Sequence, residues 1–238
     1  MFVPTLVLGV GLSLNACSSK EEAPQEVTQA AQAIGDEYSC SGTPRIFIAD
    51  ISAVSAETFG NTSTGLAYTD KEGIHLSSKE STTFMASLVM HETLHWCADR
   101  ETSKTYTPAY HISSNMEMTR STGFVPTING EIEQSGPTHV EEGVVEWVAR
   151  QESDYQPHAD YDQLADLTSE IAKLRGFDTH DVVDLLKNDD LVGYVALVTD
   201  RTASEVKGED IFKVIQTYID TYDHKAVPSV QRLYKIFS

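Results

Sequence analysis

The feature that most constrains this chain is an apolar segment that carries His91, Glu92 and His95 in the pattern HExxH. Residues 78–100 predict a long helix in which the residues around the motif are apolar on almost every side. A buried helix does not carry two imidazoles and a carboxylate without partners, because burial of unpaired polar groups costs free energy. Since residues i and i+4 share one helix face, both histidines can bind a single metal ion.

A third ligand has to come from elsewhere in the chain, because a catalytic zinc ion takes three protein ligands and leaves one position for water. Asp99 and Glu101 follow the motif closely, and Glu142 lies further on, in the segment THVEEGVVEWVAR (138–150). As a helix, this segment places a polar stripe opposite a row of valines; the stripe consists of His139, Glu142, Glu146 and Arg150. Such a stripe is often a solvated face. The residues alone leave all three acidic candidates open.

The two segments together resemble the gluzincin group of zinc metallopeptidases. In that group an HExxH helix is followed by a second helix of the form Glu-Gly-x-x-Glu/Asp-aromatic. Here HETLH is followed by EEGVVEW, with Glu142 47 positions after His95. The resemblance covers residues 64–150. It implies that His91, His95 and Glu142 bind one Zn²⁺ ion per chain and that Glu92 is the catalytic base.

The resemblance also implies supporting residues around the ion. Glu146 stands where many gluzincins have an aspartate that bonds a ligating histidine, and Asp99 matches a frequent acidic position after the second histidine. Residues 73–77 (GIHLS) are similar to the edge strand that lines the substrate cleft. Such enzymes stabilise the oxyanion with a tyrosine, histidine or arginine, and the candidates here are His111, His139, Tyr194 and Arg120.

These residues predict a zinc-dependent metallopeptidase whose substrate is a peptide or protein. Water polarised by the metal and deprotonated by Glu92 is expected to attack the peptide carbonyl. Two alternatives stay open: a non-catalytic envelope lipoprotein that uses the fold as a binding or structural module, and a zinc hydrolase of non-peptide amides. Glu92 favours an enzyme, because a structural zinc site needs no base and is normally closed by a fourth ligand.

The pattern of apolar residues predicts one continuous α+β domain. Strands are expected at 45–51, 64–70, 73–77 and 116–127, the second and third as a hairpin and the fourth within an otherwise irregular segment, 101–135. Helices are expected at 25–37, 78–100 with Ser77 or Ser78 as N-cap, 137–151, 160–175, 179–188, 190–203 and 208–222. With the resemblance, this order indicates a zincin-like fold, in which a small N-terminal β-sheet and the active-site helix precede a mainly helical C-terminal half.

The N-terminus predicts an exported lipoprotein. Residues 2–16 form an apolar run that is too short to span a bilayer as a helix and is typical of a secretory signal. The run ends in Leu-Asn-Ala before Cys17, which resembles a bacterial lipoprotein box with a lipidated cysteine. We therefore expect a lipoprotein signal peptide at 1–16, a lipidated Cys17 with an acidic linker over 17–38, and the metallopeptidase domain over 39–238. The lipid would anchor the protein to a membrane of the bacterial cell envelope, and Ser18 is compatible with the outer membrane.

Cysteine content and charge add two expectations. Cysteines of exported proteins are normally oxidised, so Cys40 and Cys97 are expected to form a disulfide, with two separate buried thiols as the alternative. The 238 residues include 36 acidic and 17 basic side chains, which give a formal net charge of -19. Because such a charge repels phosphate backbones, no nucleic-acid partner is expected.

Overall fold

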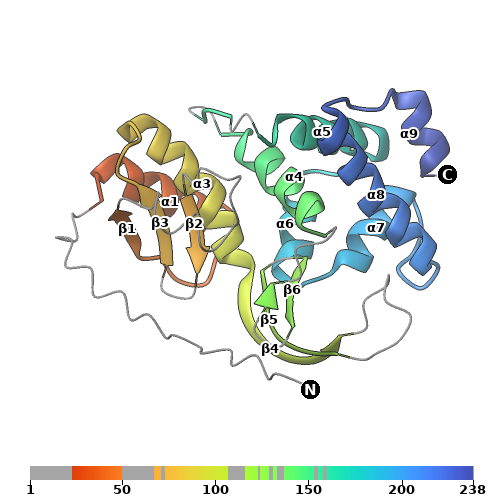
Figure 1. Cartoon of the computed structure of the whole chain (residues 1–238), viewed down its shortest axis with the longest axis horizontal. Coiled ribbons are helices and arrows are strands. Elements are labelled where there is room, and N and C mark those ends of the chain that lie inside the picture. The colour runs from red at the N-terminus through yellow and green to blue at the C-terminus, as the bar shows by residue number, and fades with distance from the viewer. Residues whose placement is uncertain are drawn as a thin grey trace, which may run out of the picture.

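Figure 1 shows the fold of the chain in a computed structural model. The structure describes residues 23–49, 67–70, 73–106, 116–122, 124–128, 131–132, 137–152, 155–157 and 160–237. The expected signal peptide and Cys17 therefore lie outside the described residues. Within the described ranges, no helix is both long and apolar enough to cross a lipid bilayer.

The N-terminal half combines two helices with a small sheet in the described residues (Figure 1). The elements are α1 (Gln25–Glu37), β1 (Ile46–Ala49), β2 (Ala67–Asp70), β3 (Gly73–Ser77) and α3 (Thr82–Ala98). The strand order is β1-β3-β2, with β1 parallel and β2 antiparallel to β3. The predicted hairpin is confirmed, but the expectation that residues 73–77 form the edge strand is wrong. These residues have a neighbouring strand on each side, and β1 and β2 are the two edges among the described strands.

Helix α3 lies between two apolar clusters, which explains why almost all of its faces are apolar. One cluster includes Met85 and Val89 of α3 together with Val27 of α1 and Ile74 of β3. The other cluster is the core of the C-terminal half, to which α3 contributes Leu94. The HExxH motif therefore lies where the two halves of the chain meet.

Both ends of α3 differ from the predicted range of 78–100. The side-chain oxygen of Ser81, rather than that of Ser77 or Ser78, accepts the backbone N–H three residues further on at 3.3 Å. This hydrogen bond caps the first turn, so the helix begins one residue after the capping serine. At the other end, the chain from Asp99 onward pairs as a strand, and the helix stops before it.

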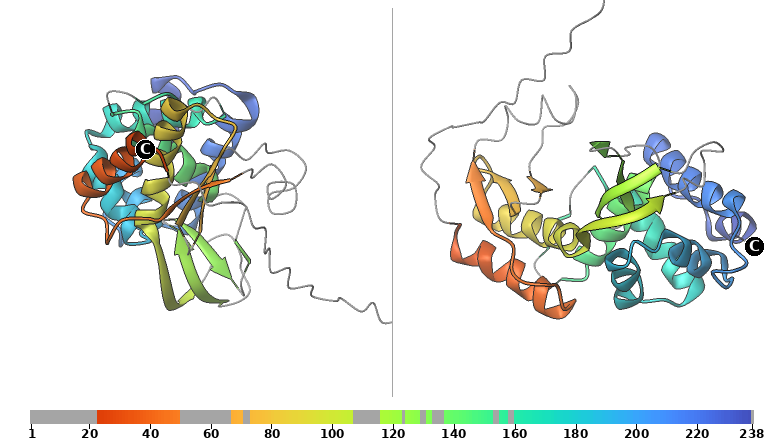
Figure 2. Two further views of the ribbon diagram at one scale, coloured as in Figure 1. Left: turned by 90° about the vertical axis from the view of Figure 1, so that its left-hand side faces the viewer. Right: turned by 90° about the horizontal axis from the view of Figure 1, so that it is seen from below.

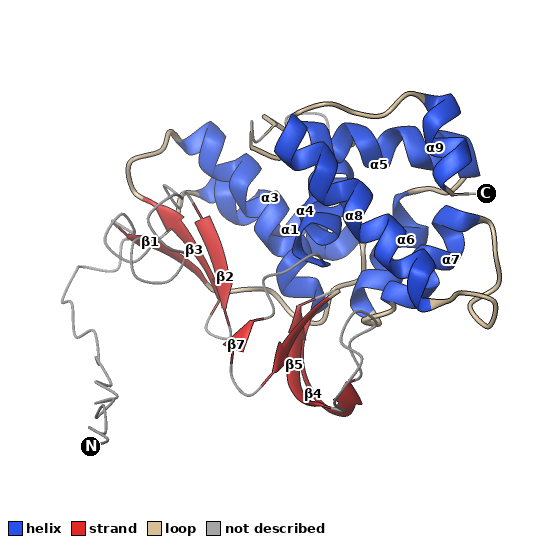
Figure 3. Ribbon diagram, turned by 45° about the vertical axis from the view of Figure 1, so that its right-hand side comes forward, coloured by secondary structure: helices blue, strands red, loops and turns tan. Residues whose placement is uncertain are grey.

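A four-stranded antiparallel sheet follows α3 and projects from the helical body (Figures 2 and 3). Its strands are β4 (Asp99–Tyr106), β5 (Met116–Thr122), β6 (Val125–Ile128) and β7 (Glu131–Ile132), paired in that order. This corrects the prediction of a mostly irregular segment over 101–135 with one strand at 116–127. The strands are rich in threonine and charged residues. They form because neighbouring segments pair with each other, and their sequence carries little of the apolar alternation that identifies a strand.

The C-terminal half is helical, as predicted. The helices are α4 (Pro137–Ala149), α5 (Asp162–Arg175), α6 (Thr179–Lys187), α7 (Leu191–Thr199), α8 (Gly208–His224) and the additional α9 (Val230–Ile236). Helix α4 packs against α3, α5, α6 and α8. Gly143 permits this packing, because a Cβ atom there would lie 2.7 Å from the ring of Tyr218 and 3.0 Å from the Cβ of Leu164.

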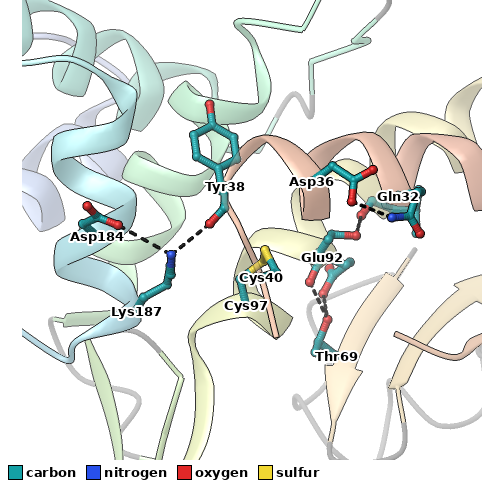
Figure 4. The surroundings of a disulfide bond; sticks show 11 residues. Gln32, Asp36, Tyr38, Cys40, Thr69, Glu92, Cys97, Asp184 and Lys187 are labelled. Atoms are coloured by element: carbon teal, nitrogen blue, oxygen red, sulfur yellow. Dashed lines mark hydrogen bonds and ion pairs between the residues drawn. A yellow bond between two sulfur atoms is a disulfide. The ribbon is translucent and has the colours of Figure 1, made fainter. Parts of the chain in front are cut away.

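Helix α1 confirms the helix predicted at 25–37, and it packs into the folded part of the chain. Val27 and Ile34 are fully buried, and α1 packs along α3. Shortly after α1, Cys40 forms a disulfide with Cys97 near the end of α3, and their Cα atoms lie 5.0 Å apart (Figure 4). The predicted disulfide is confirmed, and such a bond is typical of proteins outside the reducing cytoplasm.

Candidate metal centre

Three side chains from α3 and α4 converge on one point. Nε2 of His91 lies 3.2 Å from Nε2 of His95. Oε2 of Glu142 lies 3.1 Å from the first of these nitrogens and 3.4 Å from the second. A tetrahedral zinc ion with bonds of about 2.0–2.1 Å separates neighbouring donor atoms by about 3.3 Å. The three donor atoms therefore already form a triangle of the size that one zinc ion requires.

The positions of these ligands follow from one local rule and one long-range contact. His91 and His95 are four residues apart in α3, so their rings leave the same face of the helix. Glu142 comes from α4, which packs against α3. The side chain of Glu142 is 19% exposed, whereas those of the histidines are 8% and 12% exposed. The group is thus nearly buried, and within the described residues it is the only such cluster of metal-binding side chains.

Glu146 binds the outer nitrogen of His91. Its Oε2 lies 3.1 Å from Nδ1 of His91 and also accepts the hydroxyl of Tyr155. Its Oε1 accepts Nε of Arg150 at 3.1 Å, and the same guanidinium contacts Asp162 of α5. When Nε2 of a histidine binds a metal, Nδ1 carries the proton, so this fully buried carboxylate fixes the tautomer and the orientation of the ring. The polar stripe of α4 therefore faces the site here and not the solvent.

A second buried carboxylate, Glu141, binds the outer nitrogen of His95. Its Oε1 lies 2.8 Å from Nδ1 of His95. Its Oε2 accepts the backbone N–H of Phe124, between β5 and β6, at 2.7 Å. Both candidate ligand histidines thus have a carboxylate on Nδ1. Sequence reasoning missed Glu141, and the only available signal was its position directly before Glu142.

The charges of this cluster depend on one another. Burial opposes the charge of His91, but its hydrogen bonds to Glu142 and Glu146 outweigh burial and raise its pKa to about 9. Burial also opposes the charge of His95, yet Glu142 and Glu141 raise its pKa well above the usual value. In the same way, His95 and His91 overcome burial and hold the pKa of Glu142 far below its usual value. Without a metal, the surrounding carboxylates therefore favour the positively charged form of both imidazoles, and a metal ion must displace the proton from any Nε2 that carries one.

Glu92 lies outside the convergent group. It is one residue past His91, which places it about 100° further around the helix. Its Oε2 accepts the hydroxyl of Thr69 in β2 at 2.7 Å (Figure 4). A carboxylate beside the candidate ligands, but not among them, is able to accept or donate a proton there.

Tyr161, directly before α5, is another site residue that sequence reasoning missed. Its ring stacks on the imidazole of His91, with centroids 5.8 Å apart and planes inclined by 11°. The negative charge of Glu142, together with burial and Glu92, raises the pKa of Tyr161 well above 10. Its hydroxyl therefore stays protonated and can donate a hydrogen bond. Its sequence neighbours follow no recognisable motif, so no local signal pointed to it.

Among the remaining predicted site residues, the structure describes the side chains of Tyr194 and His139. Tyr194 is not part of the site, because it is fully buried in the core with its hydroxyl 2.6 Å from that of Tyr218. His139 lies one turn before Glu142, and its ring contacts that of Tyr222 at a centroid distance of 4.8 Å. The side chains of four further candidates lie outside the described part of the structure: Asp99, Glu101, His111 and Arg120.

Comparisons of the chain with protein families, with curated proteins and with solved structures give no match. What the structure shows by itself is a buried His-His-Glu group with the spacing of a metal site. Two further buried carboxylates support this group, and a fourth glutamate, Glu92, follows His91 in α3 and accepts the hydroxyl of Thr69.

Proposed function

We propose that this chain is a zinc-dependent metallopeptidase of the gluzincin type that hydrolyses peptide bonds with Glu92 as general base. The observation that carries the proposal is the triangle of donor atoms from His91, His95 and Glu142, whose sides measure 3.1–3.4 Å. Three protein ligands leave the fourth position of a tetrahedral ion open, which is the arrangement of catalytic zinc sites. Glu92, which follows His91 in the chain and is not among the three ligands, favours hydrolysis over a structural site, because a structural zinc site needs no base.

Each residue of the site has a task in this reaction. A zinc ion held by His91, His95 and Glu142 would polarise a water molecule and the substrate carbonyl and lower the pKa of that water toward neutrality. A carboxylate oxygen of Glu92 accepts that proton and later delivers it to the nitrogen of the leaving amine. Glu146 and Glu141 keep the protons of the two ligand histidines on Nδ1, so that both Nε2 atoms present lone pairs to the metal. The hydroxyl of Tyr161 donates a hydrogen bond to the carbonyl oxygen as negative charge develops on it.

Metal content and ligand variants test whether His91, His95 and Glu142 bind zinc. Purified protein should retain about one zinc ion per chain after dialysis, as measured by elemental mass spectrometry. His91→Ala, His95→Ala and Glu142→Ala should each lose most of this zinc. Glu170→Ala, which removes a carboxylate on the surface of α5, should retain it. Folded wild-type protein without bound zinc would contradict the proposal.

A library of internally quenched fluorogenic peptides of random sequence tests whether the protein hydrolyses peptide bonds with Glu92 as the base. The zinc-loaded wild type should cleave part of the library, and removal of zinc should abolish cleavage. Glu92→Gln keeps the size of the side chain but removes the base, so it should retain zinc while kcat falls by at least about 10². Loss of zinc in this variant would make Glu92 a ligand, and unchanged turnover would exclude it as the base.

We further propose that a lipid on Cys17 anchors the domain to the bacterial cell envelope. The support is the resemblance of the N-terminus to a lipoprotein signal and the Cys40–Cys97 disulfide, which indicates export. Metabolic labelling with a fatty-acid analogue should mark the wild type and Cys40→Ser but not Cys17→Ser. Label that persists on Cys17→Ser would contradict the assignment.

A further inference from the structure

A hydroxyl from the edge of the N-terminal sheet binds the carboxylate that we propose as general base. Thr69 lies in β2, and its Oγ1 donates to Oε2 of Glu92 at 2.7 Å. The same hydroxyl lies 3.1 Å from the backbone carbonyl oxygen of Glu92. Figure 4 shows the two side chains pointing toward each other, one from the strand and the other from α3. The contact therefore joins β2, an edge strand, to the HExxH helix at the proposed base itself.

The backbone around Thr69 fixes where this hydroxyl points. Thr69 is paired with Ile74 in the β2–β3 ladder, and the branched Cβ of threonine restricts rotation about χ1. A glutamate has three rotatable side-chain bonds, so an unbound Glu92 would sample several orientations. A hydrogen bond from a hydroxyl to a charged carboxylate is short and strong enough to select one of them. One carboxylate oxygen is then held by the strand, and the other is left to exchange a proton with the attacking water.

We propose that Thr69 is a positioning residue, whose hydroxyl holds Glu92 in the orientation in which its carboxylate serves as the base. This inference rests on the proposed function, because it assigns Thr69 a part in the same reaction. The proposed role depends on the hydroxyl of Thr69 and not on its shape. Valine has the same branched Cβ but cannot donate a hydrogen bond. Serine retains the hydroxyl and lacks the methyl group. The two substitutions therefore separate the hydrogen bond from packing.

The first experiment compares Thr69→Val and Thr69→Ser on the fluorogenic peptide that the wild type cleaves best. Thr69→Val should lower kcat about tenfold or more, with KM and zinc content unchanged, because a misplaced base slows the chemical step without altering substrate binding. Thr69→Ser should keep kcat within a few-fold of the wild type. A loss of kcat that is equal in both variants, or an unchanged kcat in Thr69→Val, would overturn the proposal.

Thr93→Val is the matched control. Thr93 follows Glu92 in α3, is fully buried, and donates its hydroxyl only along the helix, to the carbonyl of Val89 at 2.6 Å. The same chemical change at this position should leave kcat within a few-fold of the wild type. If Thr93→Val reduced kcat as much as Thr69→Val does, the effect would belong to the packing of α3 and the proposal would fail.

The second experiment needs neither zinc nor a substrate. In metal-free protein, the thermal unfolding midpoint is measured for Thr69→Val, Glu92→Ala and the double variant, which together form a double-mutant cycle. If Thr69 holds Glu92, Thr69→Val should lower the midpoint clearly in the wild-type background and much less in the Glu92→Ala background. Additive shifts would overturn the proposal. If the wild type cleaves no peptide, the proposed function fails, while this cycle still decides whether Thr69 holds Glu92.

Discussion

Oε1 of Glu141 lies 2.8 Å from Nδ1 of His95, and the other oxygen of the same carboxylate accepts the backbone N–H of Phe124 at 2.7 Å. One buried side chain thus connects a candidate metal ligand to the turn between β5 and β6. His91 is held differently, by Glu146, whose second oxygen binds Arg150. The two histidines are therefore oriented by separate networks, which can be disturbed one at a time.

Glu141→Gln is expected to weaken zinc binding by about 10–100-fold, the usual effect of losing a partner of a metal-ligating histidine. A carboxylate accepts from both N–H donors, whereas a glutamine amide presents one acceptor and one donor and fits only one of them. Competition with a chromophoric chelator measures the affinity. Glu209→Gln, the same change on the exposed surface of α8, should bind zinc like the wild type. Equal affinities of Glu141→Gln and the wild type would show that His95 does not depend on this carboxylate.

Zinc binding at pH 7 is expected to release between one and two protons per chain. In the metal-free protein the neighbouring glutamates raise the pKa of His91 to about 9 and the pKa of His95 well above its usual value, so the charged imidazolium form is favoured at both rings before the metal binds. Isothermal titration calorimetry in buffers of different ionisation enthalpy counts the protons. The affinity for zinc should therefore increase as the pH rises toward 9. A binding heat that is independent of the buffer would contradict this charge assignment.

The pKa shifts of the site residues also predict how the stability of the metal-free protein depends on pH. The pKa of His91 is raised on folding, so its contribution to the free energy of unfolding is fully present below about pH 6.5 and is lost as the pH rises through about 9. The pKa of Glu142 is lowered on folding, so its contribution to the free energy of unfolding is present above about pH 4.5 and is lost as the pH falls. The thermal midpoint should fall from pH 6.5 to pH 9 without zinc and change much less with zinc bound. Parallel curves for the two forms would contradict the prediction.

Tyr161→Phe is expected to lower kcat by at least about tenfold while zinc content stays at the wild-type level, because the variant keeps the ring on His91 and loses only the hydroxyl. Steady-state kinetics on the fluorogenic peptide, with zinc content as a second readout, measure both effects. Tyr234→Phe makes the same change at a residue that is 58% exposed on α9, and it should match the wild type. Unchanged kcat in Tyr161→Phe would remove this residue from the proposed mechanism.

Removal of the disulfide is expected to destabilise the protein without emptying the metal site. Cys40 and Cys97 are 57 residues apart in sequence, and closure of a loop of this length contributes roughly 4 kcal/mol in the chain-entropy picture. For a chain of this size, this corresponds to a thermal midpoint about 10 °C lower in the Cys40→Ala/Cys97→Ala variant. Calorimetry measures the shift, and zinc content should be retained. A phosphine reductant should lower the midpoint of the wild type and leave the double variant unaffected; any other pattern would contradict the prediction.

Local sequence patterns predicted most of the helices and only part of the strands. The five helices from 137 to 222 were recognisable because each repeats apolar residues at the helical period, and such a signal lies within one segment. The sheet β4–β7 was not recognisable, because its strands are polar and are defined by pairing with one another. The assignment of the edge strand failed for the same reason. The pattern of GIHLS indicates a strand, but which strands flank it depends on β1, which is far away in sequence.

The sequence by itself determined the two histidines, because their spacing of four residues and the period of the α-helix place both rings on one face wherever the helix lies. It also narrowed the third ligand to three acidic residues. Only the tertiary structure brought Glu142 to the histidines, Glu141 to His95 and Thr69 to Glu92, since these pairs join elements that are 23 to 51 residues apart in the chain. Contacts of this kind follow from how whole helices and strands pack, and no period within a single segment encodes them.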